Sequence, residues 1–149
     1  MTALKLPAEG GCRCGKIRLE ITRAPIMVTA CHCRGCQRMT SSAYSLTAIF
    51  PDAGFEVVQG EPVLGGLHGV HKHFFCDHCK SWLFTRPEGM VGMVNVRPTM
   101  FDDATWAAPF VDTCAATKLP WATTGAKYSY DEWPPESDYP RLMQEFAAQ

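Results

Sequence analysis

The chain has no excess of charge of either sign and no long apolar segment. It contains 14 lysines and arginines against 15 aspartates and glutamates, for a formal net charge of −1 over 149 residues. A nearly neutral chain has no general attraction to nucleic acid or to anionic lipid, so we expect neither as a partner. Its apolar runs all fall short of the roughly 20 residues that a membrane-spanning helix needs, and we expect no membrane association.

The sequence also lacks a secretory signal, internal repeats and low-complexity segments. The first residues, MTALKLPAEGG, contain no apolar core and no small-residue cleavage pattern. We therefore expect a cytoplasmic protein. Hydrophobic residues make up 46% of the chain and charged residues 19%, and this balance, at this length, predicts one globular domain over residues 1–149.

The distribution of apolar residues predicts a mainly β fold. Residues 16–22, KIRLEIT, alternate charged and apolar side chains with the two-residue period of a half-buried strand. Other short segments are rich in β-branched or aromatic residues and bounded by glycine or proline, and we expect strands at 45–50, 55–60, 70–75, 81–86 and 90–96. Residues 33–42 and 139–148 are expected to form short helices. From residue 107 to the second helix we expect irregular structure.

Cysteine, in contrast, is abundant, with eight residues. Cys114 stands alone, and the others fall in three clusters: Cys12-x-Cys14, Cys31-x-Cys33-x-x-Cys36 and Cys76-x-x-Cys79. The cytoplasm keeps thiols reduced, and these short spacings are typical of metal ligands. An even number of cysteines also permits disulfides, so metal binding is the favoured interpretation and disulfides are the alternative.

The first and third clusters together offer four thiolates. A structural zinc ion takes four soft ligands in a tetrahedron, and two cysteine pairs on tight turns can supply them. Glycines flank the first pair, and the second pair lies between two expected strands. We therefore predict a structural zinc ion held by Cys12, Cys14, Cys76 and Cys79, with metal-free buried thiols as the alternative.

The middle cluster offers only three thiols. A zinc ion with three protein ligands keeps one coordination position open, which distinguishes a catalytic site from a closed one. Three thiolates make the ion electron-rich, so it suits the binding of an incoming thiol better than the generation of hydroxide. We therefore predict a second, more labile and catalytic zinc ion on Cys31, Cys33 and Cys36, acting in thiol or carbon–sulfur chemistry.

Residues near the middle cluster add candidates and alternatives. Arg34 and Arg38 could bind the carboxylates of an anionic thiol such as glutathione, or could be solvated charges on a helix face. Cys114 or a nearby histidine could close the site as a fourth ligand. A metal-free cluster could instead serve redox chemistry.

Four histidines are further candidates for metal binding or for a role at the middle cluster. His32 lies between two cysteines of the middle cluster, where its side chain could contact the site without binding metal, or could act as an acid–base group. His68, His71 and His73 form a second group, and the last two would share one face of a strand. They could hold a metal, but an exposed polar face is the favoured interpretation.

The clusters and their surroundings resemble the glutathione-dependent formaldehyde-activating enzyme family, which includes centromere protein V. The segments that carry the resemblance are GGCRCGKIRLEI, ACHCRGCQRMTSSAYS, FFCDHCKSWLFTRPEG, VNVRPTMFDD and KLPW. The resemblance implies a β-tent fold, in which several small antiparallel sheets surround a structural zinc ion. It also leads us to expect glycine after the second pair, where this chain has Lys80.

The resemblance implies a function as well. Cys12, Cys14, Cys76 and Cys79 match the structural zinc ligands of the family, and Cys31, Cys33 and Cys36 match its catalytic zinc ligands. The implied activity is that of a carbon–sulfur lyase, which combines glutathione and formaldehyde to S-hydroxymethylglutathione. The alternatives are a non-catalytic zinc-binding interaction module and a thiol redox or metal sensor.

Overall fold

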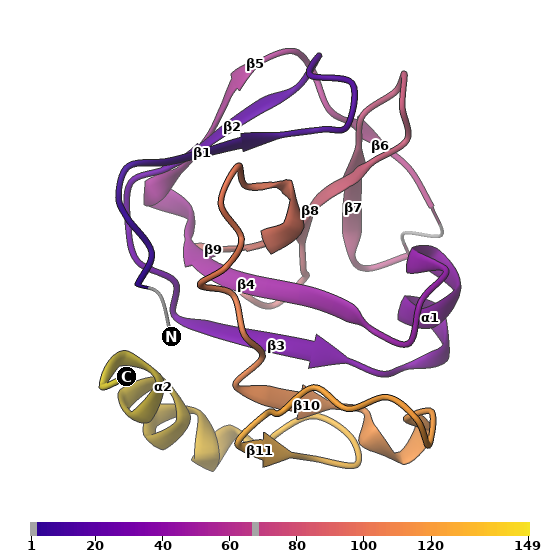
Figure 1. Cartoon of the computed structure of the whole chain (residues 1–149), viewed down its shortest axis with the longest axis vertical. Helices are drawn as coiled ribbons and strands as arrows, with labels where there is room; N and C mark the ends of the chain where they lie inside the picture. The colour runs from indigo at the N-terminus through magenta and orange to yellow at the C-terminus, as the bar shows by residue number, and fades with distance from the viewer. Residues whose placement is uncertain (1–2, 67–68) are drawn as a thin grey trace. The chain divides into compact units, whose positions relative to one another are not determined.

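The computed structural model describes residues 3–66 and 69–149 (Figure 1). Strands account for 32% of the protein and helices for 19%, which confirms a mainly β fold with several sheets and short helices. The strands are β1 (Ala8–Gly11), β2 (Arg18–Ile21), β3 (Met27–Cys31), β4 (Ser45–Pro51), β5 (Phe55–Gln59), β6 (Val63–Leu64), β7 (Lys72–Phe75), β8 (Trp82–Arg86), β9 (Met93–Val96), β10 (Val111–Thr113) and β11 (Tyr128–Ser129). The helices are α1 (Arg34–Thr40) and α2 (Tyr139–Ala147), with 3₁₀ turns η1 (Asp52–Gly54), η2 (Pro98–Met100), η3 (Ala115–Thr117) and η4 (Glu136–Asp138).

The chain divides into two compact units, each built from two separate stretches of sequence. The first unit consists of the residues up to Pro25 together with Ile49–Trp106. The second consists of Ile26–Ala48 and Ala107–Gln149. The single domain expected from the composition stays a prediction.

The first unit contains an antiparallel sheet in the order β1, β2, β5. Strand β2 buries Leu19 and Ile21 completely and leaves its two charged residues half-buried, which is the alternation that predicted this strand. In β1, a Cβ atom on Gly10 would come within 2.3 Å of the Met100 carbonyl oxygen. Only glycine therefore lets β1 approach this backbone and bridge to Phe101, just before the turn that carries the first cysteine pair.

The first unit also contains the antiparallel strands β6, β7, β8 and β9, in that order. The turn between β7 and β8 carries the second cysteine pair. The three strands expected at 70–75, 81–86 and 90–96 are present with shorter bounds. Val94 and Val96 are fully buried on one face of β9, and Leu83 is fully buried in β8, so burial favours one register for the strands that carry the cysteine turn.

In the second unit, β10 lies between β3 and β11 and runs parallel to both (Figure 1). The irregular structure expected from residue 107 to the second helix is therefore wrong at β10 and β11. Asp112 and Thr113 interrupt the apolar pattern of β10, yet both are buried. Parallel pairing joins strands distant in sequence, so a local pattern does not show it. The register pairs Thr113 with Cys31, which places the end of β10 beside the middle cysteine cluster.

Helix α2 confirms the second expected helix and packs within the second unit. Leu142 is fully buried, and the ring centroid of Phe146 lies 5.5 Å from that of Phe110. An amphipathic helix of this length gains its stability from such packing rather than from intrinsic propensity. Among the described residues, neither helix combines the length and apolar character needed to cross a membrane.

Candidate metal centres

Two turns of the first unit bring four cysteine sulfurs together. The turn after β1 contributes Cys12 and Cys14, the turn after β7 contributes Cys76 and Cys79, and the four sulfurs all lie within 4.8 Å of one another. Cys12 Sγ is 3.4 Å from Cys14 Sγ, which is 3.7 Å from Cys76 Sγ. Sulfurs bound tetrahedrally at about 2.3 Å from zinc stand about 3.8 Å apart. This four-cysteine group therefore has the dimensions of a zinc site.

Hydrogen-bond donors face the sulfurs of the four-cysteine group. The Ile17 amide donates to Cys12 Sγ over 3.3 Å, and although burial opposes ionisation, this bond and the thiols of Cys14 and Cys76 lower the pKa of Cys12. The Ser81 hydroxyl lies 3.2 Å from Cys79 Sγ and is the largest reason that the pKa of Cys79 falls to about 5. Thiolates are the form that binds metal, so the surroundings of Cys12 and Cys79 favour metal binding. Against a hydrogen bond from the Lys16 backbone, burial and the neighbouring thiols raise the pKa of Cys14 to about 11.

Lys80, where a glycine was expected, adopts the left-handed backbone conformation that glycine favours, with a φ of 59°. Its ammonium group lies 2.8 Å from Asp77 Oδ1 in an exposed ion pair. A left-handed non-glycine residue costs about 1–2 kcal/mol, and an exposed ion pair contributes only about 0.2–1 kcal/mol. The turn therefore holds residual backbone strain.

We expect Lys80→Gly to raise the free energy of unfolding by up to about 1 kcal/mol, because glycine accepts this conformation without steric cost. Denaturant unfolding of the zinc-loaded protein measures the change. Lys80→Ala is the matched control, since it removes the ion pair and keeps the strain, and it should be less stable than the wild type. A glycine variant no more stable than the alanine variant would contradict the strain argument.

The middle cluster gathers three sulfurs within the second unit. Cys31 ends β3, Cys33 is the N-cap of α1 and Cys36 lies in the first turn of that helix. Among the described residues these three sulfurs form one group, all within 4.8 Å of one another. The Cys36 amide donates to Cys33 Sγ over 3.3 Å. The capping bond that starts the helix therefore also positions two of the three sulfurs.

The thiols of this three-cysteine group differ in acidity. A hydrogen bond from the Cys36 thiol is the largest cause that lowers the pKa of Cys31, to about 5, against the effect of burial. The same contact raises the pKa of Cys36. The contact thus favours the thiolate form of Cys31, and a metal ion would displace the proton of the next thiol. Three thiolate donors fit a soft divalent metal such as zinc.

Cys114 lies near the three-cysteine group but outside it. Burial, followed by the charge on Cys31, raises the pKa of Cys114 to about 12. Its backbone has a φ of 54°, and its amide donates to the Glu132 carbonyl oxygen over 2.8 Å. Its sulfur is not among the three that lie within 4.8 Å of one another, so in the described structure this group has three cysteines rather than four.

The two candidate arginines lie on the helix that carries the last cysteine of this group. Arg34 and Arg38 are four residues apart in α1 and both are exposed. Residues at this spacing share one face of a helix, so an anionic ligand could contact both. Carboxylate binding by Arg34 and Arg38 stays a prediction.

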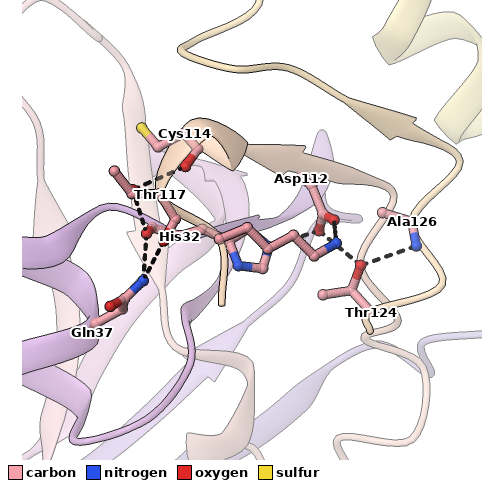
Figure 2. A network of polar contacts seen from close by, with 8 residues as sticks. His32, Gln37, Asp112, Cys114, Thr117, Thr124 and Ala126 are labelled. Atoms are coloured by element: carbon pink, nitrogen blue, oxygen red, sulfur yellow. Dashed lines mark hydrogen bonds and ion pairs between the residues drawn. The ribbon is translucent and has the colours of Figure 1, made fainter. Parts of the chain in front are cut away.

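His32 lies between the first two cysteines of the three-cysteine group, and its side chain is fully buried. Its Nε2 is 3.1 Å from Asp112 Oδ1 (Figure 2). The Asp112 carboxylate also accepts hydrogen bonds from Lys118 Nζ over 2.6 Å and from the Thr124 hydroxyl over 2.8 Å. Sequence reasoning missed Asp112, for which the available signal was an acidic residue inside the apolar segment PFVDT.

The other histidines do not form a metal group within the described part of the chain. His71 is exposed, and His73 Nδ1 lies 2.8 Å from the Thr85 hydroxyl oxygen. His68 lies outside the described residues. Nδ1 of His73 therefore takes part in a side-chain contact between two paired strands, which is common in antiparallel sheets.

Known proteins resemble this chain both as a family and in fold. The model of a protein family described as "Glutathione-dependent formaldehyde-activating enzyme" matches residues 7–116. Among solved structures, the crystal structure of a Rhodobacter sphaeroides protein, a Northeast Structural Genomics target, has a TM-score of 0.53 and 20% sequence identity, covering 63% of this chain and 87% of that chain. This likeness supports the fold alone. No curated protein matches the chain.

Proposed function

Because the chain belongs to the glutathione-dependent formaldehyde-activating enzyme family, we propose that it is a zinc-dependent enzyme of the carbon–sulfur lyase type. The reaction is the reversible addition of a small thiol to an aldehyde, with glutathione and formaldehyde giving S-hydroxymethylglutathione. A carbon–sulfur bond forms, the carbonyl group becomes a hydroxyl group, and the thiol proton moves to the oxygen of that hydroxyl. The reaction therefore needs no oxidant. The observation that carries the proposal is the group of three sulfurs.

The proposed chemistry depends on a zinc ion that has three protein ligands instead of four. Cys31, Cys33 and Cys36 would hold the ion through their sulfur atoms. Zinc bound in this way would supply a soft, open coordination position that favours the deprotonated form of an incoming thiol. Cys31 is only 5% exposed, whereas Cys33 and Cys36 are half-buried, so the group combines one buried sulfur with two that lie nearer the solvent.

Recognition of the thiol substrate falls to the two arginines of α1 in this proposal. Arg34 and Arg38 are exposed on one face of the helix that carries Cys36. A guanidinium group binds a carboxylate through two parallel hydrogen bonds. We propose that the pair favours an anionic thiol such as glutathione over a neutral thiol.

The four-cysteine group has a different role in the proposal. Cys12, Cys14, Cys76 and Cys79 supply a complete tetrahedral set, so zinc bound there would have no open position for a substrate. Its binding free energy would instead stabilise the fold of the first unit. We further propose that the enzyme works in the cytoplasm, where reduced thiols remain available as ligands.

The proposed function can be tested with protein whose zinc has been replaced by Co²⁺. We expect up to two ions per chain, one in each cysteine group, with one removed more readily by a chelator because three ligands hold less firmly than four. Glutathione should change the sulfur-to-cobalt charge-transfer bands of the labile ion. S-methylglutathione is the matched control, because it has the same carboxylates but no free thiol, and it should leave the bands unchanged.

Three results would count against the proposal. Equal responses to both compounds would show anion binding without thiol binding. If no thiol changes the spectrum, the proposed reaction loses its basis. Equal chelator resistance at both ions would indicate two closed structural sites and favour a non-catalytic zinc-binding module.

A further inference from the structure

The backbone of His32 is held from three sides. Its amide donates to the Thr113 carbonyl oxygen over 2.9 Å, which extends the pairing of β3 with β10. Its carbonyl oxygen accepts from Gln37 Nε2 over 2.8 Å and from the Thr117 hydroxyl over 2.9 Å (Figure 2). Elements β10, α1 and η3 therefore all fix the one residue that separates the first two cysteines of the three-cysteine group.

The side chain of His32 is equally constrained. The imidazole is fully buried, with its centroid 5.3 Å from that of the Tyr44 ring. Nε2 is 3.1 Å from Asp112 Oδ1, yet neither ring nitrogen makes a well-aligned hydrogen bond in the described structure. The contact with Asp112 is therefore close but not well aligned for a hydrogen bond. Buried polar atoms without aligned partners carry a free-energy cost, so this arrangement calls for a reason other than stability.

Asp112 points to the same conclusion. Its side chain is almost fully buried in β10, yet Lys118 and Thr124 both donate to its carboxylate. These bonds, together with the contact to His32, outweigh burial and lower the pKa of Asp112, so the group is anionic. A buried charge network is not needed for stability, because an apolar side chain of similar volume commonly serves as well. These contacts hold the Asp112 carboxylate beside the His32 ring.

We propose that Asp112 is a positioning residue that acts through His32 to set the arrangement of the Cys31 and Cys33 sulfurs for metal binding. Successive side chains of an extended chain point to opposite sides, and Cys33 has extended backbone angles, with φ −63° and ψ 153°. Anchoring the His32 ring on one side therefore sets the direction of the two neighbouring sulfurs. The inference rests on the proposed metal at the three-cysteine group and not on the proposed reaction.

The test is the affinity of each cysteine group for Co²⁺ and Zn²⁺ in the Asp112→Asn variant, which keeps the shape and removes the charge. We expect affinity at the three-cysteine group to fall by about 10- to 100-fold, as for other groups that orient metal ligands. The ligand-field bands of Co²⁺ at this group should also change. The four-cysteine group serves as the internal reference and should keep its affinity.

Two further variants separate positioning from general destabilisation. Val111→Ala opens a cavity at the neighbouring, fully buried position of β10 and should lower the melting temperature without changing affinity at the three-cysteine group by more than about twofold. Thr124→Ala removes a hydrogen bond to the Asp112 oxygen nearest His32. Thr124→Ala should also weaken metal binding at the three-cysteine group, by a smaller factor than Asp112→Asn. This variant still tests the proposal if Asp112→Asn does not fold.

A double-mutant cycle with His32→Phe tests the route of action. If Asp112 acts through His32, Asp112→Asn should have much less effect on affinity in the His32→Phe background than in the wild type. Equal effects in both backgrounds would overturn the proposal, as would Asp112→Asn or Thr124→Ala variants that bind metal like the wild type. If the wild-type three-cysteine group binds no metal, the proposed function fails together with this inference.

Discussion

Replacement of Cys76 by serine is expected to unfold the first unit at temperatures where the wild-type protein is stable. The Cys76 side chain is 1% exposed, and its sulfur lies 3.7 Å from Cys14 Sγ inside the four-cysteine group. Structural zinc contributes about 10–16 kcal/mol in small zinc-dependent domains, whereas whole domains are stable by only about 5–15 kcal/mol. Loss of one ligand should therefore lower the free energy of unfolding by more than about 4 kcal/mol.

The expected loss of stability is large because the four-cysteine group joins two turns that are far apart in the sequence. One cysteine pair lies on the turn after β1, and the other lies on the turn between β7 and β8. Bringing such distant turns together costs chain entropy. Without the metal, packing within the first unit would have to offset this cost alone.

Thermal unfolding followed by circular dichroism, together with zinc content by mass spectrometry, measures the result for Cys76→Ser. Cys114→Ser is the matched control, because it removes a half-buried thiol that lies outside both cysteine groups. It should retain the zinc content and the melting temperature of the wild type. A Cys76→Ser protein that melts with the wild type would show that the four-cysteine group does not stabilise the fold.

Replacement of Cys33 by serine should abolish the catalysed addition of glutathione to formaldehyde while the fold persists. Cys33 is the N-cap of α1, and its sulfur accepts a hydrogen bond from the Cys36 amide. Serine is among the best N-cap residues, so the helix should keep its first turn. The substitution does, however, remove one of three soft donors. Since changes at groups that only orient ligands already cost about 10- to 100-fold, we expect a loss of more than about 100-fold.

The rate at which ¹³C-formaldehyde and glutathione combine, followed by NMR and corrected for the uncatalysed reaction, measures the effect of Cys33→Ser. The variant should keep one tightly bound zinc ion and a melting temperature close to that of the wild type. Cys114→Ser should keep the catalysed rate. Loss of the rate in Cys114→Ser would instead make Cys114 a fourth ligand, and an active Cys33→Ser enzyme would move the chemistry away from the three-cysteine group.

Local spacing carried most of the information on the candidate metal centres. Cysteines two or three positions apart on a turn can meet at one centre whatever the rest of the fold does. The spacing therefore separated a set of two pairs from a set of three, and the structure brings the same sulfurs together. Alternation likewise predicted β2, because burial of Leu19 and Ile21 on one face is a property of the strand itself.

Partners from distant segments could not be predicted in this way. Asp112 has the same neighbours in the sequence whether it is solvated or buried, and only the pairing of β10 with β3 places it beside His32. The left-handed backbone of Lys80 likewise breaks a local preference that the tertiary structure overrides. The sequence by itself thus determined that seven cysteines fall into two pairs and one group of three, because ligand spacing acts over a few bonds, whereas the fold brings the two distant pairs together. The tertiary structure alone decided which side chains surround those cysteines and that Cys114 stays outside the group, because these contacts depend on how distant strands pack.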